Sequence, residues 1–124
     1  MDMNVLRDKI YGCWLGKNVG GTLGAPIEGR CDFMDIKWFP ELGEKGCIPN
    51  DDLDLQLLNL HALEHYGASL RAEQLGRQWA EHNYFPVDEY GYAVTNLRRG
   101  LHLPLAGCYN NIFTSCMGSP IRSE

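Results

Sequence analysis

Pro49-Asn50-Asp51-Asp52-Leu53-Asp54-Leu55-Gln56 opens a leucine-rich run that continues to Leu63. Leucine, glutamine, alanine and histidine dominate this run, and these residue types favour a helix over a strand. Pro49 closes a loop, and Asn50 or Asp51 is a good N-cap for the helix that follows. The stretch therefore predicts a helix with a cluster of carboxylates at its N-terminal end.

These acids have two interpretations. Carboxylates are common in a first helical turn, because the free N–H groups and the helix dipole stabilise negative charge there. At about 100° per residue, however, Asp52, Gln56 and Asn59 share one face of a helix that is otherwise apolar. Buried polar groups need partners, and a cation is one partner that carboxylates recruit. Spacing alone favours capping and solvation somewhat over a metal site and leaves both interpretations open.

Composition narrows the function classes. The chain has 124 residues, enough for one domain or part of a larger one, and a formal net charge of −5. No cluster of lysine and arginine could follow a phosphate backbone, so nucleic acid is not an expected partner. No apolar run approaches a membrane span, and the N-terminus lacks a signal-peptide pattern. Five cysteines without a C-x-x-C pair favour reduced thiols, and we expect a cytoplasmic protein without a membrane partner.

The segment before the acids reads as a glycine-rich helix over residues 5–24. Its glycines recur at every fourth position and form one bare stripe: Gly12, Gly16, Gly20 and Gly24. Such a stripe lets another backbone approach closely, and packing against a neighbouring helix is the favoured interpretation. Gly24-Ala25-Pro26-Ile27-Glu28-Gly29 ends the helix with stop signals and places Glu28 in the loop just beyond it.

The remainder of the chain is also predominantly helical. A short strand is expected at residues 35–39, and an amphipathic helix at 70–83 with Ser69 as its N-cap and Gln78 on its polar face. A further helix is expected from about Glu89 to Leu101. With no hairpin signal, the fold class is predicted to be all-α with short antiparallel connections. The chain ends within an apparent helix start, which predicts an incomplete domain.

Three motifs, in order along the chain, resemble the ADP-ribosylglycohydrolase family. Residues 12–28 look like the family's N-terminal signature, a glycine-rich helix that ends in a G-D-A-L-G-A-P-x-E type of turn. Asn50-Asp51-Asp52-Leu53 looks like its Thr-Asp-Asp-Thr metal motif, and residues 115–122 look like its glycine-rich substrate loop. The resemblance covers essentially all 124 residues, but only about the first third to half of a family domain.

The resemblance implies a fold and an activity. The expected fold is an ADP-ribosylglycohydrolase-like orthogonal helical bundle, incomplete here, with residues 1–124 as its N-terminal part. The expected reaction is hydrolysis of the N- or O-glycosidic bond to ADP-ribose, with ADP-ribose or an ADP-ribosylated molecule as the substrate. Family members typically use two magnesium ions for this reaction, and manganese is the alternative metal.

The resemblance also implies roles for single residues. Asp51 and Asp52 match metal ligands, and the Asn50 side chain stands where the motif has threonine. Glu28 matches the glutamate that places the substrate or activates water, so Glu28 and Asp52 are the catalytic candidates. The residues that would contact the substrate are Ser115, Gly118 and Ser119. Arg122 matches the terminal arginine of the motif, and its implied role is structural.

Several positions depart from the family pattern. Gly21 replaces an aspartate, and Asn50 and Leu53 replace the two threonines. Ser119-Pro120 replaces Gly-Ala in the last motif. The second acidic motif, Asp-x-Asp-Ser/Thr, which lies near the C-terminus of the family domain, is absent, so a two-metal site would be incomplete. The alternative is a non-catalytic helical module or truncated fragment that self-associates or binds a partner through exposed core.

Overall fold

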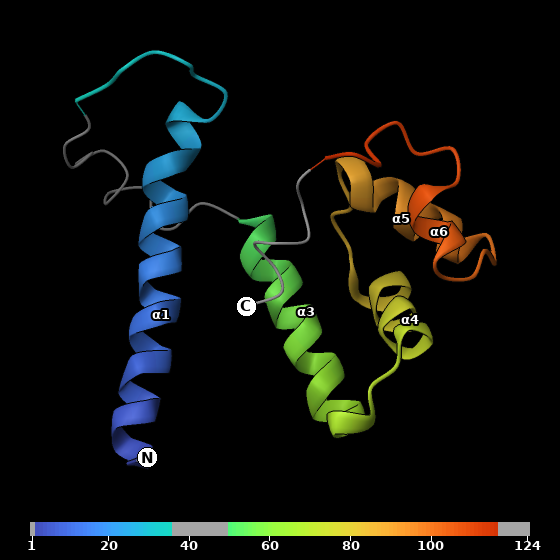
Figure 1. Cartoon of the computed structure of the whole chain (residues 1–124), viewed down its shortest axis with the longest axis horizontal. Coiled ribbons are helices and arrows are strands. Elements are labelled where there is room, and N and C mark those ends of the chain that lie inside the picture. The colour runs from blue at the N-terminus through green and yellow to red at the C-terminus, as the bar shows by residue number, and fades with distance from the viewer. Residues whose placement is uncertain (1, 36–49, 117–124) are drawn as a thin grey trace. The chain divides into compact units, whose positions relative to one another are not determined.

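The computed structural model describes residues 2–35 and 50–116, and these residues form helices and no strand (Figure 1). The all-α class predicted from the sequence is therefore confirmed. The chain divides into two compact units, Met1–Asn50 and Asp51–Glu124. The strand expected at residues 35–39 lies outside the described residues except for its first position. That residues 1–124 form the N-terminal part of a larger domain stays a prediction.

The first unit is built on the long helix α1, Met3–Gly24. The Asp2 side chain caps it by accepting a hydrogen bond of 2.8 Å from the backbone N–H of Asn4. None of the residues of α1 is buried. Within this unit, a Cβ built at Gly12, Gly16, Gly20 or Gly24 meets no atom within 4 Å. Among the described residues of this unit, the close helix contact expected at this stripe is thus not made, and it stays a prediction.

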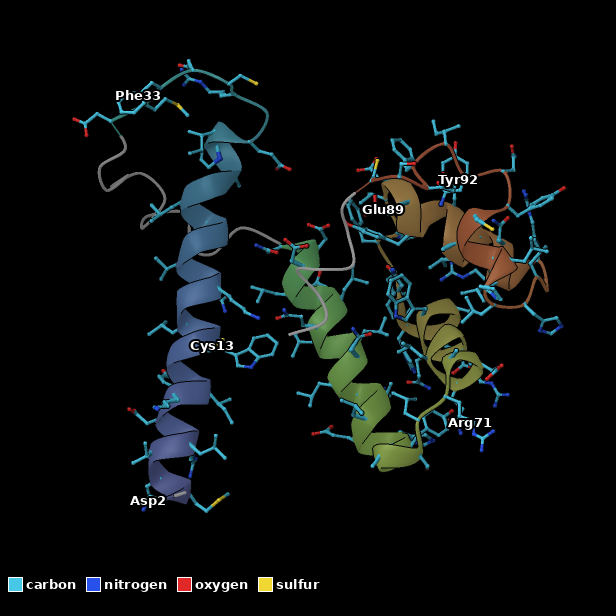
Figure 2. All side chains as sticks on the ribbon, in the orientation of Figure 1. Asp2, Cys13, Phe33, Arg71, Glu89 and Tyr92 are labelled. Carbon is cyan, nitrogen blue, oxygen red and sulfur yellow. The ribbon has the colours of Figure 1, made fainter. Side chains whose placement is uncertain are left out.

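The predicted stop after α1 is confirmed. A short 3-10 helix, η1 (Ala25–Ile27), follows with Pro26 near its start. The backbone N–H of Glu28 bonds to the Ala25 carbonyl at 3.4 Å, and Gly29 then adopts a φ of +77°. This left-handed conformation favours glycine and turns the chain away from the helix axis. The loop beyond it leaves the Phe33 ring fully exposed (Figure 2).

The second unit contains four α-helices in its described part. They are α3 (Asp51–Tyr66), α4 (Ala72–His82), α5 (Asp88–Arg98) and α6 (Leu105–Cys108), with a 3-10 turn η2 (Gly67–Ser69) after α3. Successive helices pack on one another: α3 on α4, α4 on α5, and α5 on α6 (Figure 1). Their shared core is formed by apolar side chains: Leu55, Leu58, Ala62, Tyr90, Val94 and Ala106.

Amide side chains attach the segment after α5 to α5 itself. Asn96 is buried, and its Nδ2 donates to the carbonyls of Ala106 at 2.9 Å and Tyr109 at 2.8 Å. Nδ2 of Asn111 donates to the carbonyls of Glu89 at 3.0 Å and Gly107 at 2.9 Å. Three of these acceptor carbonyls lie in or just after α6, and the fourth, that of Glu89, lies in α5, so the two amides link the segment after α5 to that helix.

Two details of α4 differ from the prediction. Ser69 is not its N-cap: it lies in η2, and Arg71 precedes the helix with its N–H bonded to Gln74 Oε1 at 2.8 Å. Gln78 is buried, not solvent-facing, because its Oε1 lies 2.7 Å from Nδ1 of His61 on α3. The polar face of α4 is therefore narrower than its residue types suggest.

The end of α5 also differs from the prediction. The helix ends at Arg98, three residues earlier than expected, and Gly100 follows with a φ of +88°.

Two further observations concern membrane-spanning helices and cysteine pairing. No helix in the described part of the chain combines the length and the apolarity needed to cross a bilayer. Four cysteines in the described ranges are unpaired and exposed: Cys13, Cys31, Cys108 and Cys116. The cytoplasmic location stays a prediction.

Candidate metal and substrate site

The acids that open α3 lie in its first turn, as the sequence predicts. Asp51, Asp52 and Asp54 all belong to that turn, where the helix dipole favours negative charge. Asp51 is exposed, and its Oδ2 accepts a hydrogen bond from the Tyr90 hydroxyl of α5. Asp52 is half-buried. One of the two candidate metal acids is thus tied to a neighbouring helix.

Tyr90 and Trp79 provide partners for the polar side of α3. The Tyr90 ring meets the Trp79 ring of α4 edge-to-face, with centroids 6.3 Å apart. Nε1 of Trp79 donates to Oδ1 of Asn59 at 3.3 Å. The sequence analysis did not identify either aromatic residue as part of the candidate site. The signal was available for Tyr90, since it precedes Val94 by four positions on α5 and a buried tyrosine hydroxyl usually finds a partner.

The start of the predicted substrate segment is attached to α5. Ser115 lies in an exposed turn, two residues after Phe113. The Phe113 ring is 6.0 Å from the Tyr92 ring on α5, and Asn111 bonds the Glu89 carbonyl (Figure 2 labels Glu89 and Tyr92). The same helix therefore contacts Asp51 and the segment that leads to Ser115. The other predicted members of this segment lie outside the described residues: Gly118, Ser119 and Arg122.

The remaining candidates belong to the first unit. Glu28 is exposed at the end of η1, and Asn50 is half-buried at the end of that unit. A Cβ built at Gly21 would overlap the Asn50 side-chain amide, so the glycine leaves room for that amide. Because Asp51 and Asp52 lie in the second unit, the role that the resemblance implies for Glu28 beside these acids stays a prediction.

The donor set suits part of a hard-cation site. Among the described residues, no three histidine, cysteine, aspartate or glutamate side chains form a group that could hold a metal ion. Magnesium, however, is commonly bound through one or two carboxylates and keeps several waters. Asp51 and Asp52 supply two carboxylates of the kind that this mode of binding uses.

Two other polar groups are engaged elsewhere. The Arg30 guanidinium pairs with Asp32 at 2.6 Å and lowers the pKa of that exposed carboxyl below its usual value. His61 lies within ring contact of His82, at 4.9 Å between centroids, and of His65, at 6.4 Å. The His61 and His65 rings are stacked nearly parallel, an arrangement that suits packing better than converging nitrogen ligands.

Comparison with known proteins agrees with these features. The ADP-ribosylglycohydrolase family model matches residues 2–123, which is essentially the whole chain. No curated protein and no solved structure matches the chain. The family is helical and uses metal ions, in keeping with the all-α fold and the acids of α3. This chain belongs to the ADP-ribosylglycohydrolase family.

Proposed function

We propose that this chain contributes to magnesium-dependent hydrolysis of the N- or O-glycosidic bond that joins ADP-ribose to another molecule. The observation that carries the proposal is the family match over residues 2–123. The acidic first turn of α3 supports it, because Asn50-Asp51-Asp52-Leu53 resembles the family's metal motif and carboxylates supply oxygen ligands. The substrate is therefore ADP-ribose linked through nitrogen or oxygen.

In this scheme Asp51 and Asp52 hold a divalent cation, magnesium or alternatively manganese, with the Asn50 amide beside them. When bound, such a cation offsets negative charge and orients oxygen atoms of the substrate or water. Asp51 and Asp52 are well suited to this role, since their carboxylates open the same turn of one helix.

The other candidates act on the substrate. Glu28 accepts a proton from the attacking water, whose oxygen joins the anomeric carbon of the ribose. The bond from that carbon to nitrogen or oxygen breaks, and the leaving group takes up the proton that Glu28 accepted. Ser115, Gly118 and Ser119 bind ADP-ribose through hydroxyl and backbone N–H donors. Catalysis by residues 1–124 alone requires these groups to meet.

Thermal unfolding with magnesium and ADP-ribose tests the binding part of this proposal. A ligand at a hundredfold excess over its Kd stabilises the folded state by about 2.7 kcal/mol. We expect wild type and Asp54→Asn to show this ligand-dependent rise, and an Asp51→Asn/Asp52→Asn variant to lose it. Asp54→Asn is the matched control, because Asp54 lies in the same turn. A folded wild type without a rise, or an equal rise in the double variant, would contradict the proposed site.

A non-catalytic helical module is the second candidate. Leu57, Leu60 and Leu63 of α3 remain 52%, 44% and 49% exposed, although they lie on the most leucine-rich helix. Contiguous exposed apolar surface often marks an interaction site. In the same samples, an unfolding temperature that does not change with magnesium and ADP-ribose but shifts with protein concentration would favour the module over the hydrolase.

A further inference from the structure

We infer that Tyr90 is a positioning residue for the Asp51 carboxylate and, through it, for the cation of the proposed function, on which this inference rests. The Tyr90 hydroxyl donates a hydrogen bond to Oδ2 of Asp51. Both residues belong to the second unit, so the contact does not involve the placement of α1. Neither the metal motif nor the substrate motif of the sequence contains Tyr90.

The contact has the form of an outer partner to a metal ligand. An ionised carboxylate accepts at both oxygens, so a donor on Oδ2 orients the group and leaves Oδ1 available to a cation. Among the described residues, the Tyr90 hydroxyl is the one hydrogen-bond partner of the Asp51 carboxylate. Asp51 itself is exposed, so a ligand can reach it from solvent, whereas the Tyr90 side chain that contacts Oδ2 is buried.

The ring that carries the hydroxyl is held by its neighbours. Tyr90 is only 6% exposed, and its ring packs edge-to-face on Trp79. Trp79 in turn donates to Asn59, which lies on the same helix as Asp51. The contacts thus run from α3 to α4, from α4 to α5, and from α5 back to α3. Because these contacts link all three helices, they fix the Tyr90 hydroxyl relative to the first turn of α3.

The backbone that carries Tyr90 is also fixed on both sides. A Cβ built at Gly91 would lie 3.2 Å from the Pro86 carbonyl oxygen, so the first turn of α5 packs closely on the preceding loop. On the other flank of Tyr90, Asn111 donates to the Glu89 carbonyl at 3.0 Å. Because Asn111 leads toward Ser115, the turn that orients Asp51 is also the turn that anchors the predicted substrate segment.

A purely structural role would give Tyr90→Phe a different signature. Phenylalanine keeps the ring and its packing on Trp79 and removes only the hydroxyl. Loss of a structural hydrogen bond lowers the midpoint of unfolding but leaves cation affinity of the folded protein unchanged. Loss of an outer partner weakens cation affinity, typically roughly 10–100-fold. The two roles are therefore separable under conditions where every variant is folded.

The test measures manganese binding by the loss of the free-ion electron paramagnetic resonance signal, using the full chain. Tyr90→Phe is compared with wild type and with Tyr92→Phe, a matched control on the same helix whose ring contacts Phe113. We expect Tyr90→Phe to raise the manganese Kd roughly tenfold or more and Tyr92→Phe to leave it unchanged. In an Asp51→Asn background, Tyr90→Phe should weaken the residual affinity no further.

Urea unfolding of each variant in chelator-containing buffer confirms that the chains compared are folded. If wild type binds manganese and Tyr90→Phe binds it equally well, or if Tyr92→Phe weakens binding as much, the positioning role is overturned and the proposed function stands. If folded wild type binds no manganese, the proposed cation site fails and the inference fails with it.

Discussion

Replacing Asn96 with aspartate is expected to lower the free energy of unfolding by about 3 kcal/mol or more. Asn96 is 5% exposed, and its Nδ2 donates to the carbonyls of Ala106 and Tyr109. Aspartate has nearly the same shape but, when ionised, cannot donate and places a negative charge beside two carbonyl oxygens. The deficit should shrink at low pH, because a protonated carboxyl stabilises the folded state by regaining one donor.

Thr95→Asp is the matched control for this substitution. Thr95 is the exposed neighbour of Asn96 on α5, so the same charge enters the same helix without being buried. Its effect should stay within about 0.5 kcal/mol. Urea unfolding followed by circular dichroism at neutral pH measures both variants. Equal stability of Asn96→Asp and Thr95→Asp would show that the Asn96 bonds do not hold α6 to α5.

Val94→Asp is expected to be at least as damaging, at about 4 kcal/mol or more. Val94 has no exposed surface and is the largest fully buried side chain among the described residues. An aspartate there loses apolar burial and finds no solvent for its charge. Since small domains are stable by only about 5–15 kcal/mol, this variant should be largely unfolded at 25 °C.

Val94→Ala keeps this second prediction measurable if the aspartate variant does not fold. Removing two methyl groups from a fully buried position should cost about 1–3 kcal/mol and leave a cooperative transition. Thr95→Asp serves again as the control. A Val94→Asp protein as stable as Thr95→Asp would mean that α5 does not face the core as described.

The helices were predictable where sequence signals were strong and local. The glycine and proline signals after α1 predicted its end at Gly24, and the acids of the first turn of α3 predicted its start near Asp51. Gln78 was assigned to the wrong face because α4 packs on both α3 and α5, so one of its polar residues is buried against His61. Residue type alone cannot reveal how many neighbours a helix has.

The candidate site was predictable only in part, for a similar reason. Asp51 and Asp52 became candidate metal ligands through their resemblance to the family's acidic motif, since spacing alone favoured capping, and their binding of a metal stays a prediction. Tyr90 was missed, although it precedes Val94 by four residues, because its role depends on a contact between α5 and α3. The catalytic role that the resemblance implies for Glu28 depends on how the two units meet, which no local pattern encodes.

Release of free ADP-ribose from an ADP-ribosylated protein, followed by mass spectrometry in magnesium buffer, tests most directly whether Asp51 and Asp52 serve a hydrolase. Wild type and the same-turn control Asp54→Asn should release ADP-ribose over time. The Asp51→Asn/Asp52→Asn variant should fall to the background of the uncatalysed reaction while remaining folded. No release by folded wild type, or equal release by the double variant, would contradict a hydrolase that works through these two carboxylates.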